Sequence, residues 1–167
     1  MRRSIYAVIA IIMLVTTYPA LGAQPASLVG SQAPRFRGID LRGSRLEVPA
    51  SGSPTVVVFW NSRYRVSADA LSAMQRLYDM YKKKGLVCAG LNDLGEDASL
   101  AKQVASQLGI TFPLFTGRDT VGAAASYRVR GVPVVFVIDQ TGLVISVEEG
   151  FGPGAEARVA GSVVSLL

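Results

Sequence analysis

The residues from Thr55 to Trp60 constrain the fold more than any other part of the sequence, because all six are apolar, aromatic or β-branched. A strand with one face in water alternates apolar and polar residues, and this run does not. We therefore predict a central strand that is covered on both faces. An amphipathic helix is expected from Ser67 onward, so residues 59–71 form a strand-to-helix junction. Such junctions often carry reactive groups, because a helix N-terminus has free backbone N–H groups and a partial positive charge.

The rest of the sequence alternates between strand-like and helix-like segments, which is typical of βαβ units in an α/β domain. In chain order, the predicted elements are an exposed hairpin over 37–48, a helix over 67–84, a buried strand over 86–91, a helix over 97–108, an extended segment over 110–115, a short helix over 120–129, a hairpin over 133–147 and a closing helix after 154. For the helix over 97–108, the expected apolar face consists of Leu100, Val104 and Leu108.

The first 23 residues are typical of an export signal. Arg2 and Arg3 precede an uncharged apolar run over 5–15, and small residues follow at 20–23. The apolar run is shorter than the roughly 20 residues that a membrane span needs, so cleavage near Ala23 is favoured over a retained N-terminal anchor. We therefore divide the chain into a signal peptide or anchor over 1–23 and one domain over 24–167. This division predicts a periplasmic or secreted protein, held at the inner membrane when the segment is not cleaved.

The composition argues against several classes of function. The chain has no histidine and one cysteine, which leaves too few ligands for a typical zinc, copper or iron site, and no loop has the acidic spacing of a hard-cation site. We expect no metal and no cofactor. Arg2 and Arg3 account for two of the five net positive charges, and no basic tract with interleaved aromatic residues is present, so a nucleic-acid partner is not expected either.

The single cysteine, Cys88, cannot form an intramolecular disulfide. It lies inside the apolar run 86–91, where a small buried side chain is expected, so we interpret it as an inert core thiol. An exposed Cys88 would instead allow an intermolecular disulfide in an oxidising compartment.

Several short sequence words occur together in an order and spacing that one known family shares. These words are Val29-Gly30 with Ala33-Pro34 and Phe36, Val58-Phe59-Trp60, Lys84-Gly85-Leu86-Val87, Gly109-Ile110-Thr111-Phe112-Pro113, Val129-Arg130-Gly131-Val132-Pro133, and Phe136-Val137-Ile138-Asp139 with Gly142. From about Val29 to Leu167, the chain resembles the thioredoxin-like domains of the exported TlpA/ResA type. These are thiol-disulfide oxidoreductases within the redoxin group, which also includes the peroxiredoxins. The resemblance implies a thioredoxin-like three-layer α/β fold, with a central mixed sheet flanked by helices.

The resemblance also shows what the junction lacks. The family typically reads Phe-Trp-Ala-Ser-Trp-Cys-Pro-Pro-Cys-Arg-Ala-Glu here, and this chain aligns with it without a gap. The CxxC motif is replaced by Tyr64-Arg65-Val66-Ser67, and the acid beyond it is replaced by Ala70. Disulfide exchange needs a thiolate and a second, resolving thiol, and neither tyrosine nor serine supplies one. We therefore expect no catalytic residue at Tyr64 or Ser67, and a peroxiredoxin reaction fails for the same reason.

A serine hydrolase is the other chemistry to weigh at the junction. Ser62 or Ser67 would need a base, and with no histidine only lysine or a carboxylate remains. No such base is suggested by the spacing. We interpret these hydroxyls as loop or helix-cap groups.

Peptide binding is the function that the resemblance still allows. It implies that Pro133 is cis and that Val132 offers its backbone N–H and C=O groups to an extended peptide. Arg63, Arg65 and Arg130 would then attract carboxylate or phosphate groups near the helix N-terminus. The alternative is that these arginines are ordinary exposed residues in a loop released from redox constraint.

Three functional hypotheses follow. The first is a noncatalytic binding module, in which Arg63, Tyr64 and Arg65, together with Arg130, Val132 and Pro133, contact a peptide or an exported protein. The second is a thiol-disulfide oxidoreductase of periplasmic redox homeostasis, acting through Cys88 or through thiols of a partner. The third is a structural relic without a ligand. Contact with the membrane is expected only through an uncleaved N-terminal segment.

Overall fold

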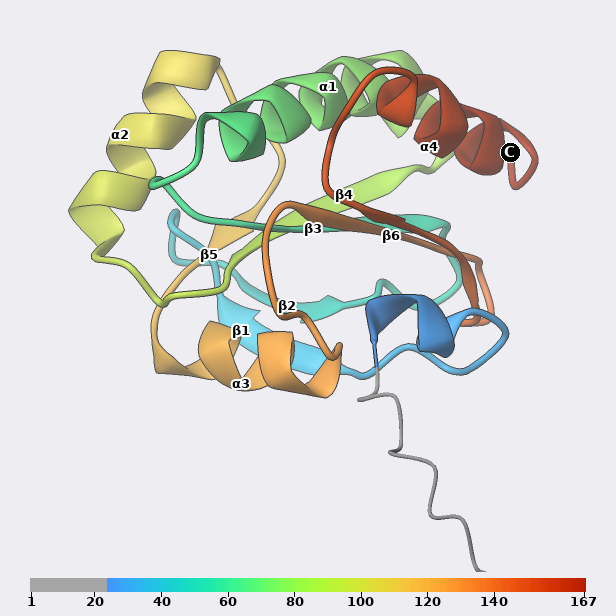
Figure 1. Cartoon of the computed structure of the whole chain (residues 1–167), viewed down its shortest axis with the longest axis horizontal. Helices are drawn as coiled ribbons and strands as arrows, with labels where there is room; N and C mark the ends of the chain where they lie inside the picture. Colours follow the sequence, from blue (N-terminus) through green and yellow to red (C-terminus); the bar gives the residue numbers. More distant parts are fainter. Residues whose placement is uncertain (1–23) are drawn as a thin grey trace, which may run out of the picture.

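The computed structural model describes residues 24–167, and the predicted signal segment lies outside them. A five-stranded sheet with the order β5-β4-β3-β6-β7 forms the middle layer (Figure 1). Its strands are β3 (Thr55–Trp60), β4 (Val87–Asn92), β5 (Leu114–Phe115), β6 (Val134–Ile138) and β7 (Val144–Glu149). β3, β4 and β5 pair in parallel, whereas β6 is antiparallel to both β3 and β7. The predicted mixed sheet is therefore confirmed.

Helices and a hairpin cover the two faces of the sheet. They are η1 (Pro25–Leu28), β1 (Phe36–Ile39), β2 (Arg45–Val48), α1 (Arg65–Tyr81), η2 (Lys82–Lys84), α2 (Ala98–Leu108), α3 (Arg118–Ser126) and α4 (Ala155–Val164). Figure 1 shows α1, α2 and α4 on one side, with α3, η1 and the β1–β2 hairpin on the other. The three-layer thioredoxin-like fold is thus confirmed. Among residues 24–167, no helix is both long and apolar enough to cross a membrane.

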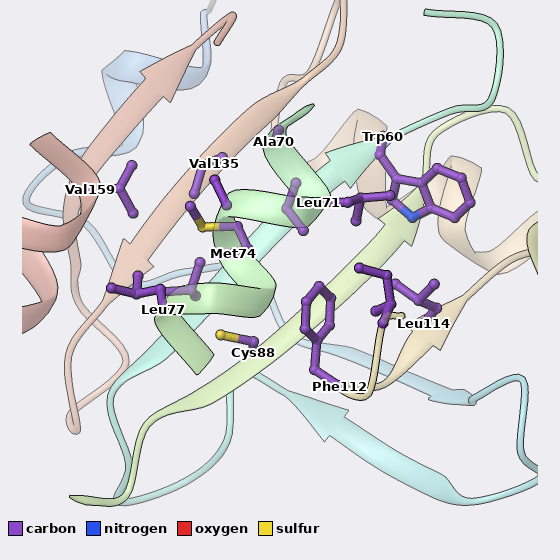
Figure 2. Close-up of a cluster of buried hydrophobic side chains, with 14 of the residues drawn as sticks. Trp60, Ala70, Leu71, Met74, Leu77, Cys88, Phe112, Leu114, Val135 and Val159 are labelled. Carbon is purple, nitrogen blue, oxygen red and sulfur yellow. The ribbon is translucent and has the colours of Figure 1, made fainter. Parts of the chain in front are cut away.

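The central strand β3 is buried along its whole length, as its composition predicts. Its side chains alternate between two cores. Val56, Val58 and Trp60 pack with α1 in one core, part of which is drawn in Figure 2. Val57 and Phe59 pack in the other core. There the Phe59 ring contacts the rings of Tyr127, which directly follows α3, and Phe136 of β6. Both faces of the sheet therefore depend on this one strand.

Helix α1 packs through the stripe that its periodicity predicts. Ala70, Leu71, Met74 and Leu77 are buried, and Figure 2 shows them facing the sheet. The helix begins at Arg65, two residues earlier than predicted. It ends through η2 at Gly85, whose φ of 97° is a left-handed conformation that favours glycine.

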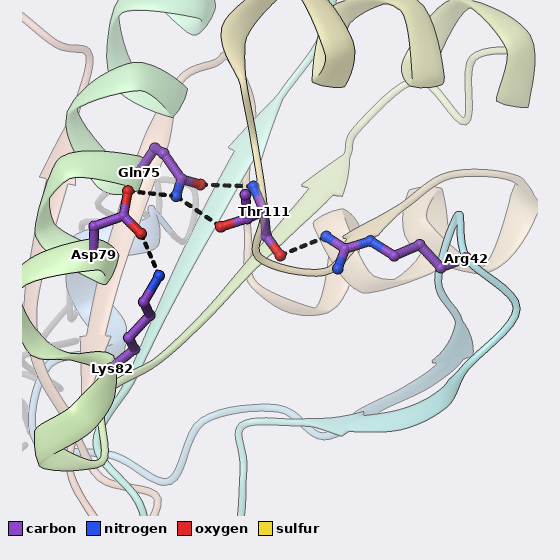
Figure 3. Close-up of polar contacts among 5 residues, drawn as sticks. All are labelled: Arg42, Gln75, Asp79, Lys82 and Thr111. Atoms are coloured by element: carbon purple, nitrogen blue, oxygen red, sulfur yellow. Dashed lines mark hydrogen bonds and ion pairs between the residues drawn. The ribbon is translucent and has the colours of Figure 1, made fainter.

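A buried glutamine joins α1 to the segment that follows α2 (Figure 3). The Gln75 side chain donates to Thr111 Oγ1 at 2.8 Å and accepts from the Thr111 backbone N–H at 2.8 Å. Asp79 accepts the second Gln75 N–H and also pairs with Lys82. From the opposite side, the Arg42 guanidinium donates to the Thr111 carbonyl. The segment before β5 is therefore held by side chains as well as by the sheet.

Two predicted elements differ from the structure. Leu100 is 38% exposed rather than part of an apolar face, because α2 turns Ala101 to the core, with Val104 and Leu108 beside it. Val104 and Leu108 lie on the core side as predicted, but spacing alone did not show that Ala101, and not Leu100, lies there with them. The predicted extended segment 110–115 forms a strand only at Leu114–Phe115, since Pro113 has no N–H for the ladder.

Gly90 provides a test of the packing between β4 and its neighbours. A Cβ at this position would overlap the Leu114 side chain and lie 3.3 Å from Trp60 Nε1. We expect Gly90→Ala to lower the free energy of unfolding by about 1–3 kcal/mol, because the core has no room for a methyl group. Denaturant titration followed by Trp60 fluorescence measures the change.

Gly122 is the matched control for this substitution. It lies in α3, and a Cβ there meets nothing within 4 Å. Gly122→Ala should leave stability unchanged or raise it by up to about 1 kcal/mol, because alanine favours the helix. Equal stability of the two variants would contradict the close packing at Gly90.

Candidate functional site

The predicted site residues lie on two loops at the same end of the sheet. The loop 61–64 follows β3, and the loop 130–133 precedes β6. Because β3 and β6 are antiparallel, with Phe59 opposite Val134, both loops leave the sheet at this end. The register therefore places Arg63, Tyr64 and Arg65 near the loop that carries Arg130.

The two positions of the missing cysteines differ sharply in exposure. Tyr64 is the N-cap of α1, its side chain is 54% exposed, and it makes no capping hydrogen bond. Ser67 is fully buried, donates its backbone N–H to the Tyr64 carbonyl at 3.0 Å, and accepts from the Asn61 N–H at 3.5 Å. The tyrosine is thus available to a ligand, whereas the serine hydroxyl is enclosed.

Neither serine has the partner that a hydrolase needs. Within residues 24–167, no lysine or carboxylate contacts the Ser67 hydroxyl. The Ser62 hydroxyl donates to Glu96 at 2.8 Å, but the same carboxylate also accepts the Ser62 backbone N–H at 2.9 Å. Burial raises the pKa of Glu96, yet these hydrogen bonds outweigh burial and hold its pKa below the usual value. Such a carboxylate is a weak base for a hydroxyl, so the structure supports the loop role of Ser62.

The three predicted arginines are exposed. In the part of the chain that the structure describes, Arg63, Arg65 and Arg130 form no ion pair. Arg63 nevertheless lies close enough to both carboxylates to help lower the pKa of Glu96 and to offset in small part the raised pKa of Asp93. Arg65 and Arg130 are thus exposed cations that form no ion pair within residues 24–167, although Glu149 lines the same hollow as Arg130.

The loop before β6 has the geometry that the resemblance implies. The Val132–Pro133 peptide bond is cis. Arg130, Val132 and Pro133 line an open hollow of about 410 Å³, whose wall also includes Pro25 and Glu149. Within residues 24–167, neither the N–H nor the C=O of Val132 takes part in a hydrogen bond. Tyr64 and its neighbouring arginines do not line this hollow, so the site consists of two adjacent parts.

A polar network joins the loop 61–64 to the loop after β4, and sequence reasoning missed it. Asn61 Nδ2 donates to Asp93 Oδ1 at 2.9 Å, and Asn92 Nδ2 donates to Glu96 at 2.7 Å. Burial raises the pKa of Asp93 above its usual value, although its hydrogen bond with Asn61 lowers it in part. One signal was present in the sequence. Two parallel strands that end in polar residues bring those residues to the same edge of the sheet.

Cys88 is buried beneath α1, next to Leu77 and Phe112 (Figure 2). Its side chain is 0% exposed, and burial raises the pKa of its thiol. A thiol that stays protonated and enclosed is neither a nucleophile nor a metal ligand. In addition, no cluster of three or more histidine, cysteine or acidic side chains suited to a metal occurs among residues 24–167.

Comparison of the sequence with known proteins agrees with this architecture. The sequence model of the AhpC/TSA family matches residues 29–147. Thiol-disulfide oxidoreductase ResA from Geobacillus kaustophilus is 31% identical over 126 residues, which cover 75% of this chain and 71% of the relative. ResA from Bacillus anthracis is 30% identical over 120 residues, which cover 70% and 67%.

Solved structures with the same fold carry related names. A thiol-disulfide oxidoreductase from Bacteroides fragilis superposes with a TM-score of 0.68 at 22% identity, covering 82% of this chain and all of that one. A thioredoxin family thiol:disulfide interchange protein from Chlorobium tepidum gives 0.66 at 22% identity, covering 81% and 94%. The family match and the ResA relatives together establish that the chain belongs to the AhpC/TSA family, as a ResA-like protein of thioredoxin fold with a single cysteine.

Proposed function

We propose that this protein is a noncatalytic member of its family that binds an extended, acidic segment of an exported protein. The observation that carries the proposal is the free backbone of Val132 beside the open hollow at Pro133. Backbone N–H and C=O groups are obligatory hydrogen-bonding groups, and an extended peptide can pair with both at once. The hollow gives room for the side chains of that peptide.

The arginines of the two loops favour an acidic ligand, whereas the hollow itself is lined by one charge of each sign, Arg130 and Glu149. Arg65 and Arg130 are exposed cations, and Arg63 lies at the N-terminus of α1, where the helix dipole adds partial positive charge. Arginine is well suited to carboxylates because its planar fork can donate two parallel hydrogen bonds. Tyr64 adds an exposed aromatic ring between two of these arginines, and such rings are common at binding surfaces.

The buried thiol argues against exchange chemistry. The relatives are named thiol-disulfide oxidoreductases, but that reaction needs an exposed thiolate and a second thiol. This chain has Tyr64 and Ser67 at the two cysteine positions and encloses its one thiol beneath α1. Noncovalent binding does not need these groups. An export signal over 1–23 would place the binding module outside the cytoplasm.

The accessibility of Cys88 is the first prediction. We expect the folded protein to show no thiol reactive to a small aromatic disulfide reagent, and one such thiol after unfolding in guanidinium, because Cys88 is fully buried. The folded protein should also fail to reduce insulin. Insulin reduction that disappears in Cys88→Ser would instead support the oxidoreductase hypothesis.

The second prediction concerns the charge of the ligand. Two short fluorescein-labelled peptides that differ only in carrying glutamate or lysine at alternate positions are titrated with the protein, and binding is read by fluorescence anisotropy. We expect the glutamate peptide to bind. The double variant Arg63→Glu with Arg65→Glu should lower its affinity by about tenfold, since two attractions become repulsions.

Two controls separate this binding from general adsorption. Lys83→Glu with Lys84→Glu makes the same charge change at the opposite end of α1, and it should leave the affinity unchanged. Methylating alternate backbone nitrogens of the peptide should abolish binding, because the peptide N–H that would donate to the Val132 carbonyl is then removed. Equal weakening by the lysine and arginine variants would contradict a site at this end of the sheet.

The third prediction tests the inherited geometry. Tyr64→Cys with Ser67→Cys should create a disulfide that dithiothreitol reduces, because these residues occupy the cysteine positions of the family at the start of α1. Free-thiol counting before and after reduction measures it. Tyr64→Cys alone should gain one free thiol and no intramolecular disulfide, since Cys88 is enclosed. A double variant that does not oxidise would contradict the alignment of the two sites.

A further inference from the structure

The loop 61–64 carries Arg63 and Tyr64, yet it has little apolar contact of its own, because Ser62, Arg63 and Tyr64 are all exposed. Its hydrogen bonds therefore decide how it lies. The Ser62 backbone N–H donates to Glu96 Oε2 at 2.9 Å, and the Ser62 hydroxyl donates to Glu96 Oε1 at 2.8 Å. One carboxylate thus accepts hydrogen bonds from both the backbone N–H and the hydroxyl of Ser62, although Glu96 is distant from Ser62 in the sequence.

Glu96 is itself held by hydrogen bonds within the turn after β4. The Asn92 side chain donates to Glu96 Oε2 at 2.7 Å and accepts from the Glu96 backbone N–H at 3.0 Å. Asn92 is completely buried. The turn also passes close to the chain before α3, since a Cβ on Gly95 would lie 2.7 Å from the Gly117 carbonyl oxygen. The Glu96 carboxylate is therefore oriented by Asn92 independently of its hydrogen bonds with Ser62.

A second connection runs parallel to the first. The Arg63 backbone N–H donates to Asn61 Oδ1 at 3.0 Å, and the other end of the same amide donates to Asp93 Oδ1 at 2.9 Å. Two consecutive backbone N–H groups are therefore tied to the turn after β4. Glu96 accepts the N–H of Ser62 directly, and Asp93 holds the Asn61 side chain that accepts the N–H of Arg63. Within residues 24–167, no other hydrogen bond joins residues 61–64 to the turn after β4.

We propose that Glu96 is a positioning residue, which holds the backbone of Ser62 and so sets the direction in which Arg63 and Tyr64 project from the sheet. Its part in ligand binding rests on the proposed function, whereas its hold on the loop does not. A preorganised loop binds a ligand more tightly because less conformational freedom is lost on binding. The turn after β4 thereby belongs to the site, although it contributes no residue to the hollow at Pro133.

The experiment compares Glu96→Ala with Glu96→Gln. Alanine removes all three side-chain hydrogen bonds of Glu96. Glutamine keeps an oxygen for the Ser62 N–H and for Asn92, and its amide can donate to the Ser62 hydroxyl, which accepts as well as donates. Backbone amide exchange is followed by NMR at Ser62 and Arg63. We expect exchange at Ser62 to quicken by at least about tenfold in Glu96→Ala and to return close to the wild-type rate in Glu96→Gln.

Three further measurements keep the result decisive. Ser62→Ala removes only the hydrogen bond from the hydroxyl to Glu96, so exchange of the backbone amide at position 62 should be intermediate between wild type and Glu96→Ala. This variant tests the same contact if Glu96→Ala does not fold. Glu156→Ala removes a carboxylate that pairs with Arg76 elsewhere on the surface, and it should leave Ser62 unchanged. Amide exchange in the strands β3 and β4 should stay the same in every variant. A substitution that lowered the stability of the whole domain would quicken exchange in these strands as well.

Binding of the glutamate peptide is measured on the same variants. We expect Glu96→Ala to weaken binding by about fivefold or more and Glu96→Gln to restore it. If the wild-type protein does not bind the peptide, the proposed function fails, and the exchange rates alone still decide the role of Glu96. Unchanged exchange at Ser62 in Glu96→Ala, or equal loss of protection in Glu96→Gln, would overturn the inference.

Discussion

The burial of β3 on both faces is the constraint on which the rest of the structure depends. Its six side chains divide between two cores, so the strand must have a layer of helix on one side and another layer on the other. This arrangement also determines where the strand can end. Beyond its carboxyl end at Trp60, the chain first becomes exposed at Ser62, in the loop 61–64. The position of the candidate site is therefore a consequence of the core.

Much of this could be predicted from the sequence, because apolar periodicity is a local property. The uniform run 55–60 indicated a covered strand, and the stripe from Ala70 to Leu77 indicated the buried side of α1; both are confirmed. The misplaced Leu100 of α2 shows the limit of such patterns. Leu100 and Ala101 are neighbours, both are apolar, and only packing against the body of the domain decides that the smaller one is enclosed.

The candidate site was predicted less completely, for a different physical reason. The cis peptide bond before Pro133 follows the expectation from the resemblance, whereas the difference in exposure between Tyr64 and Ser67 was not predicted. The network from Asn61 and Ser62 to Asp93 and Glu96 was not predicted, because its members come from two loops whose proximity is decided by strand order. Long-range polar contacts of this kind leave no periodic trace in a sequence. Strand-end polar residues are the one signal that could have suggested them.

The enclosed Cys88 has a consequence for how such a protein would behave in a compartment whose redox state varies. Its thiol is covered by α1, and the chain has no second cysteine with which it could pair. Thiol-disulfide exchange therefore has no accessible thiol in the folded protein through which to switch the fold or cross-link it to a partner. Members of the family with two active cysteines must be returned to one oxidation state after each turnover. Under the proposed binding function, this protein needs no such regeneration, and its occupancy would follow ligand concentration.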